Sequence, residues 1–296
     1  MKLIFALGFS GLLSAQVITP SARASVVSPQ QQAKLSARPT PEFVGGEERF
    51  NELIDEVVDG FQGTVRAYGG TLVKQADWNS KTVNATAYIR GDIWKILAWG
   101  GLYRVKGMTD DSFQLAICHE AGHIMGGFPF YNGAIDATSE GQSDYFAAQV
   151  CARLLWNDNA AENAAKFALA PPSVQQRCRD TWPTSESAHL CARIAIAGEH
   201  LIAVLTPDTP VLFTTPDSQV AATTFFSSYP TPQCRVDTFF RGALCNTEWD
   251  FLSIPGFGAT DRNGIDVEVL AHRVSCSLGQ IPAGARPECW YKQRAE

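Results

Sequence analysis

Two histidines four positions apart, His119 and His123, flank a glutamate, Glu120, in the middle of the chain. On a helix, positions i and i+4 lie on one face, so both imidazoles can bind a single metal ion. Glu120 would then stand beside a water molecule on that metal. Zinc lowers the pKa of such a water to about 7, and a neighbouring carboxylate can take its proton. The pattern H-E-x-x-H therefore predicts a zinc-dependent hydrolase, against the alternative of a surface helix with two solvated histidines.

A third protein ligand is available shortly after His123. Glu140 and Asp144 are again four residues apart, so their carboxylates share one helix face. We expect Glu140 to bind the metal and Asp144 to accept the spare N–H of a ligating histidine, which would fix the ring's tautomer and orientation. The alternative is an ordinary pair of acids near a helix N-terminus, where the helix dipole favours negative charge.

The helices that must carry these groups can also be predicted. Thr109 or Asp110 is a good N-cap for a first helix, and Gly126-Gly127 closes it. The apolar run at residues 113–118 predicts that this helix is buried, and a metal would satisfy the polar groups buried with it. A second helix begins after Ser139, which forms a capping-box pattern with Gln142.

The order of these motifs resembles that of known zinc peptidases. H-E-x-x-H followed by E-x-x-x-D on a second helix is the gluzincin pattern. The closer resemblance is to the CAAX prenyl protease family of zinc metallopeptidases, which includes small soluble periplasmic bacterial members. It covers roughly Thr82 to Leu244, through the segments Val83–Tyr88, Gly100–Tyr103, 119–123 and 140–144. Tyr229 stands where the family has a histidine, and Ser143 where it has an alanine.

The resemblance implies roles for residues outside the metal motif. A strand at Asn84 and Ala85 would lie antiparallel to the backbone of a bound substrate, although a merely structural edge strand is the alternative. Arg235, in the region of the family's Arg-Ile pair, is expected with Asp144 around the metal ligands. A second donor should stabilise the oxyanion, and the candidates are Tyr229, Arg235, His189, His200 and His272. Tyr229 is preferred because of its position and because a phenol can donate a hydrogen bond.

The N-terminal residues predict export. Lys2 precedes a broken apolar run, Leu3–Val17, that is too short to span a membrane, and Ala22-Arg23-Ala24 is a signal-peptidase site. We expect residues 1–24 to be a cleaved signal peptide, with an uncleaved N-terminal anchor as the alternative. No second apolar run of spanning length is evident after it. The protein is therefore expected in the periplasm or outside the cell.

All eight cysteines follow the predicted cleavage site, and an even number in an exported chain indicates disulfides. Short separations favour three local bridges, Cys178–Cys191, Cys234–Cys245 and Cys276–Cys289. Cys118–Cys151 would then join the two metal-binding helices. The alternative is Cys118 as a metal ligand, but on a helix its side chain points about 100° away from that of His119.

Composition and periodicity indicate one α+β domain that is mostly helical. The 296 residues are 45% hydrophobic and 18% charged, with a net charge of −6. Residues 1–24 hold two bases and no acid, so the rest of the chain carries −6 − 2 = −8. No basic stripe is present, and nucleic acid is not expected as a partner.

Along the chain we predict a disordered lead at 25–44 and a metallopeptidase domain at 45–296. The domain opens with an amphipathic helix and contains a small antiparallel sheet within 71–102. Further helices are predicted over Ser139–Trp156, Glu186–Leu205 and Pro232–Leu244.

Together these features predict a secreted zinc endopeptidase that acts on peptides or unfolded proteins. One zinc ion would be held by His119, His123 and Glu140. Glu120 would take a proton from water and pass it to the leaving amine. One alternative is a binding or assembly module with a silent zinc site, although structural zinc usually has four protein ligands and needs no Glu120. The other is a zinc hydrolase of non-peptide bonds, which shares the same metal chemistry.

Overall fold

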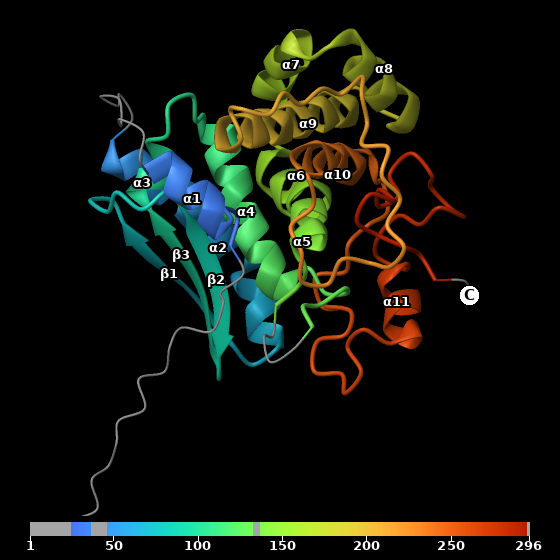
Figure 1. Cartoon of the computed structure of the whole chain (residues 1–296), viewed down its shortest axis with the longest axis horizontal. Helices are drawn as coiled ribbons and strands as arrows, with labels where there is room; N and C mark the ends of the chain where they lie inside the picture. The colour runs from blue at the N-terminus through green and yellow to red at the C-terminus, as the bar shows by residue number, and fades with distance from the viewer. Residues whose placement is uncertain (1–24, 37–45, 133–136, 295–296) are drawn as a thin grey trace, which may run out of the picture.

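The computed structural model describes residues 25–36, 46–132 and 137–294. About half of the chain is helical, and three strands form one small sheet (Figure 1). In chain order the elements are α1 (Pro29–Ser36), α2 (Glu47–Ala67), β1 (Thr71–Asp77), β2 (Ala85–Arg90), β3 (Ile93–Trp99), α3 (Gly100–Tyr103), α4 (Asp110–Met125), α5 (Glu140–Phe146), the π-helical turn η1 (Ala147–Cys151), α6 (Ala152–Trp156), α7 (Ala160–Leu169), α8 (Pro172–Thr181), α9 (Ser185–Leu205), α10 (Pro232–Leu244) and α11 (Ile265–Ala271). The α+β class is confirmed.

The sheet is mixed, so the prediction of an antiparallel sheet is wrong for one of its two strand pairs. Its strand order is β1-β3-β2, with β2 antiparallel and β1 parallel to β3. β2 and β3 form a hairpin through Gly91, which has a φ of +62° that glycine adopts readily. β3 then inserts between β1 and β2, and its direction matches that of β1. Among the described strands, β1 and β2 are therefore the two edges of the sheet.

Helix α4 is central to the molecule. It contacts β2 and β3 as well as α2, α5 and α9, and in Figure 1 it runs between the sheet and the helices α5, α6, α9 and α10. Every residue from Asp111 to Met125 is buried, as expected for a helix enclosed on all sides. The predicted ends are confirmed, because the Thr109 side chain accepts a hydrogen bond from the Ser112 N–H and the helix stops before Gly126.

Helices α5, η1 and α6 form one helical segment from Glu140 to Trp156, but the predicted capping box at its start is wrong. The Ser139 N–H donates to the carbonyl oxygen of Pro129, at 2.8 Å, so it is not available to Gln142. The Gln142 amide instead donates to the Gly126 carbonyl at 3.0 Å and accepts from Arg286 at 2.6 Å. Tertiary partners have replaced the local ones.

Helix α9 passes the length and composition test for a membrane span, yet 67% of its most apolar window is buried inside the molecule. It contacts α4, α7, α8 and α10. Burial against other protein helices is the behaviour of a core helix.

All eight cysteines form disulfides, and two of the four predicted pairs are correct. Cys118–Cys151 and Cys178–Cys191 are confirmed. The other bonds are Cys234–Cys289 and Cys245–Cys276, so the predicted Cys234–Cys245 and Cys276–Cys289 pairs are wrong. Cys234 and Cys245 lie at opposite ends of α10, about 16 Å apart at a helical rise of about 1.5 Å per residue. A disulfide spans less than about 7 Å between Cα atoms. Four disulfides indicate an oxidising, exported environment.

The first described residues differ from the predicted disordered lead. Ser25 forms an antiparallel bridge with Thr86 of β2, and α1 follows it. Val26, Val27 and Leu35 are buried. These three apolar side chains hold a segment whose average composition is polar. Residues 37–44 and the predicted signal peptide lie outside the described residues.

Candidate metal centre

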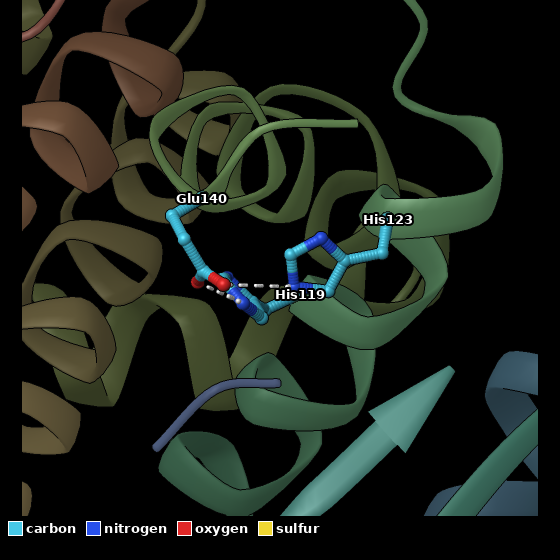
Figure 2. Close-up of side chains that lie close together, drawn as sticks. All are labelled: His119, His123 and Glu140. Atoms are coloured by element: carbon cyan, nitrogen blue, oxygen red, sulfur yellow. Dashed lines mark ion pairs between the residues drawn. The ribbon is translucent and has the colours of Figure 1, made fainter. Parts of the chain in front are cut away.

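Two histidines of α4 and one glutamate of α5 converge on a single point (Figure 2). The Nε2 atom of His119 lies 3.2 Å from Oε2 of Glu140, and Nε2 of His123 lies 3.7 Å from Oε1 of Glu140. All three candidate ligand atoms lie within 4.8 Å of one another. The three side chains have no exposed surface. The spacing on two helices has therefore brought together the three residues predicted to bind a metal.

The donor atoms at this point fit a metal ion. Nε2 of His119, Nε2 of His123 and Oε2 of Glu140 are buried, and none has a hydrogen-bond partner among the described residues. A buried polar atom left unpartnered costs about 1–3 kcal/mol. Three such atoms, two imidazole nitrogens and one carboxylate oxygen, face one another and could together hold a metal ion.

The far side of each imidazole is held by acceptors. Nδ1 of His119 lies 2.7 Å from Oδ1 of Asp144. Nδ1 of His123 lies 2.8 Å from the Thr138 carbonyl oxygen and 2.9 Å from Oγ of Ser143. A carboxylate and a carbonyl can only accept, so Nδ1 carries the proton in both neutral rings. The lone pair of each Nε2 then faces the convergence point, as metal binding requires.

Asp144 is in turn fixed by Arg235 of α10. The guanidinium donates from Nε to Oδ2 at 2.7 Å and from Nη2 to Oδ1 at 2.8 Å, a bidentate geometry. Both side chains are buried. Burial alone would raise the pKa of Asp144, but Arg235 and His119 hold it below its ordinary value. Asp144 is therefore a carboxylate, and Arg235 lies beside it as predicted.

The charge states of the three candidate ligands follow from their surroundings. Burial lowers the pKa of His123 to about 4, so this ring is neutral. Burial also lowers the pKa of His119, but Asp144 and Glu140 outweigh it and raise the pKa to about 9. Burial opposes ionisation of Glu140, and the two histidines nevertheless lower its pKa. A cation bound between these groups would displace the proton of His119.

Glu120 lies on the same helix without being part of the three-residue cluster. Burial raises its pKa to about 8. Its Oε1 atom accepts a hydrogen bond from the Val26 N–H at 2.7 Å, and its Oε2 atom has no partner among the described residues.

The residues predicted to bind substrate or stabilise an oxyanion also meet here. The Tyr229 hydroxyl donates to the carbonyl oxygen of Ser25 at 2.8 Å, and burial raises the pKa of this phenol. Asn84 and Ala85, at the start of the edge strand, are buried. Asn84 bonds both the N–H and the carbonyl of Val27.

Two contributors were missed by the sequence reasoning. The Tyr131 hydroxyl donates to Oε1 of Glu140 at 2.6 Å, and the Thr138 carbonyl orients His123. Burial, together with Glu140, raises the pKa of Tyr131, so its phenol stays protonated. Both residues lie in the irregular segment between the two helices, where no periodicity predicts which side chains turn inward. Ser143, noted only as a departure from the family pattern, contacts His123.

The other candidate groups are engaged elsewhere. His189 packs on Phe167, with ring centroids 4.5 Å apart, and His272 Nε2 lies 3.0 Å from the Tyr291 hydroxyl. His200 lines a cavity next to α1. A second set of possible ligands, Asp217 with Cys234 and Cys289, is unsuitable because its two sulfurs are joined in a disulfide.

Comparison of the chain with models of protein families, with curated proteins and with solved structures finds no match. The resemblance to the CAAX prenyl protease family therefore depends on the motifs alone and stays a prediction.

Proposed function

We propose that the protein is an exported zinc-dependent endopeptidase of the gluzincin type. The observation that carries the proposal is the meeting of three unpartnered, buried donor atoms with the carboxyl of Glu120 next to them on α4. Three protein ligands leave a coordination position open, which is typical of catalytic rather than structural zinc.

Each residue of the site has a separate role in the proposed hydrolysis. His119, His123 and Glu140 would hold zinc, which when bound polarises a carbonyl group and lowers the pKa of water. Glu120 takes the proton of the attacking water and returns it to the leaving amine. Tyr229 stays protonated and donates a hydrogen bond to the substrate's carbonyl oxygen, where negative charge develops.

Contacts between the site residues and the chain's own backbone favour a peptide substrate over a non-peptide one. The backbone of Ser25–Val27 is hydrogen bonded to Glu120, Tyr229, Arg235 and Asn84. Side chains that bind the N–H and carbonyl groups of one peptide can bind those of another. A binding module with a catalytically inactive zinc site does not require a carboxyl at Glu120, and burying that carboxyl is unfavourable in free energy.

The test is the substitution Glu120→Gln, assayed on unfolded casein with and without a zinc chelator. The variant should keep about one zinc per chain, because Glu120 is not a ligand, and the chelator should abolish wild-type activity. The hydrolysis rate should fall by about 10²–10⁴-fold, the usual cost of losing a general base. Glu248→Gln, the same change at an exposed loop position, is the matched control and should retain full activity. If wild type and Glu120→Gln both bound zinc and were equally inactive on a broad panel of peptides and unfolded proteins, the binding-module alternative would replace this proposal.

A further inference from the structure

One peptide bond of the chain itself lies against the groups assigned to hydrolysis. The carbonyl oxygen of Ser25 accepts from the Tyr229 hydroxyl at 2.8 Å, and the N–H of Val26 donates to Oε1 of Glu120 at 2.7 Å. These are the two ends of a single amide. In the proposed mechanism the first residue stabilises the carbonyl oxygen of the bond to be cut, and the second protonates its nitrogen.

The backbone atoms on either side of this amide are also hydrogen bonded to residues of the site. Nη1 of Arg235 donates to the Val26 carbonyl oxygen at 2.9 Å. Asn84 accepts from the Val27 N–H at 3.3 Å and donates to the Val27 carbonyl at 3.2 Å. Ser25 pairs antiparallel with Thr86 of the edge strand β2. Backbone bonds on an edge strand are the mode by which proteins bind extended peptides with little regard to sequence.

We infer that Ser25–Val27 is an internal peptide that occupies the substrate site in the orientation of a substrate. The Ser25–Val26 bond takes the place of the bond to be cut, and Val26 takes the place of the residue after it. This inference rests on the proposed function and specifies its substrate class, extended peptides with a small aliphatic residue after the cleaved bond. In hydrolysis of such a peptide, water adds its oxygen to the carbonyl carbon, the C–N bond breaks and the nitrogen gains a proton.

The same segment closes the site. Val26, Val27, Glu120 and the three candidate ligands have no exposed surface. A substrate can reach Glu120 only after Ser25–Val27 has left, so the segment and the substrate compete.

Helix α1 is attached to the fold by a hydrogen bond from the Asn84 amide to Oε1 of Gln32, at 2.9 Å, and by one apolar contact. Leu35 is the one buried side chain of α1. Cavities of about 440 Å³ and 180 Å³ lie beside the helix at Leu35.

The test uses a fluorescein-labelled peptide with the sequence of residues 24–30, ASVVSPQ, added to full-length Glu120→Gln protein. Adding Val26→Glu places a carboxylate where burial is unfavourable, which should expel the internal segment. A site that is open in only a fraction of molecules binds with correspondingly reduced apparent affinity, so we expect the Kd to fall by about tenfold or more. Gln30→Glu, the same charge change at an exposed position of α1, should leave the Kd unchanged. Leu35→Gln loosens α1 without touching the cleft, and should act in the same direction as Val26→Glu.

Cleavage of the same peptide by Val26→Glu protein with Glu120 intact then reports the orientation. Mass spectrometry should find a single cut, between the serine and the first valine. A cut at another bond, or equal Kd values for all variants at full zinc occupancy, would overturn the inference. Tighter peptide binding in Val26→Glu and Leu35→Gln without any cleavage would support occupation of the site by the segment, while contradicting the proposed peptidase activity.

Discussion

At the scale of single residues, Glu140 depends on a partner outside either helix. Its Oε1 atom accepts from the Tyr131 hydroxyl at 2.6 Å, while its Oε2 atom lies 3.2 Å from Nε2 of His119 and has no hydrogen-bond partner among the described residues. The hydroxyl therefore selects which carboxylate oxygen is left for a metal. Because burial keeps the phenol protonated, Tyr131 remains a donor throughout the pH range in which the protein is expected to work.

We therefore expect Tyr131→Phe to weaken zinc binding by about 10–100-fold, the effect typical of losing a hydrogen bond to a metal ligand. The ring is retained, so its packing near His123, at 6.3 Å between centroids, should persist. Zinc affinity is measured by competition with a chromophoric chelator, with Glu140→Ala as the variant expected to lose zinc altogether. Tyr68→Phe removes the hydroxyl that bonds Leu252 and Ile254 in another part of the fold and serves as the control. Unchanged zinc affinity in Tyr131→Phe would show that this hydroxyl does not orient the ligand.

What the sequence predicted at this scale follows from helical regularity. His119 and His123 are four apart, as are Glu140 and Asp144, so each pair had to share a face, and the structure does bring these residues together. Arg235 was expected beside Asp144 from the resemblance, and it lies there. Tyr131 and the Thr138 carbonyl could not be predicted in this way, because irregular backbone has no fixed period that says which groups turn inward.

At the scale of elements, the position of the candidate metal ligands depends on a close approach of α4 and α5. Gly122 lies at the contact, between the two histidines. A Cβ atom on it would lie 2.8 Å from the Cα of Ser143 and 2.9 Å from the carbonyl oxygen of Ser143. Both are backbone atoms, which cannot move aside by rotation of a side chain. The absence of a side chain at Gly122 therefore sets the distance between His123 and Glu140.

Gly122→Ala should accordingly force the two helices apart. We expect a loss of about 1–3 kcal/mol in the free energy of unfolding, as for other overpacked cores, together with weaker zinc binding. Gly63→Ala is the matched control, since Gly63 lies within α2 with nothing within 4 Å of its hypothetical Cβ. Alanine there should stabilise the protein by up to about 1 kcal/mol through helix propensity. Urea unfolding of the zinc-free proteins separates the packing effect from the metal. A Gly122→Ala protein as stable as wild type would mean that the helices can separate without cost.

Elements were easier to predict than their pairing. The three strands, the caps of α4 and the limits of α9 and α10 followed from periodicity and end signals. The parallel pairing of β1 with β3 did not, because alternation fixes which residues form a strand but not which strand lies beside it. The wrong pair Cys234–Cys245 is instructive, since the helix predicted at Pro232–Leu244 already placed those cysteines too far apart. Short separation along the chain is a poor guide to a disulfide when a helix lies between.

At the scale of the whole molecule, the C-terminal residues are bound to the helices that carry the site. Trp290 packs so closely on Gly141, the residue after Glu140, that no Cβ would fit there. Its indole N–H donates to Oγ1 of Thr238 on α10 at 2.9 Å. The neighbouring Cys289 is joined to Cys234 at the start of α10. This disulfide therefore supports α5, and with it Glu140, from outside the site.

The two disulfides Cys234–Cys289 and Cys178–Cys191 should consequently differ in their effect on zinc. Replacing both cysteines of either pair by serine should lower the thermal midpoint, because the bridges close loops of 55 and 13 residues and should contribute about 4 and 3 kcal/mol respectively. Only the loss of Cys234–Cys289 should also weaken zinc binding, since Cys178–Cys191 joins α8 to α9 away from the ligands. The measurements are thermal unfolding by circular dichroism and zinc affinity at a temperature where both variants are folded. If both variants lost zinc affinity to the same extent, the loss would reflect lower overall stability. The packing of Trp290 on α5 would then have no specific effect on zinc binding.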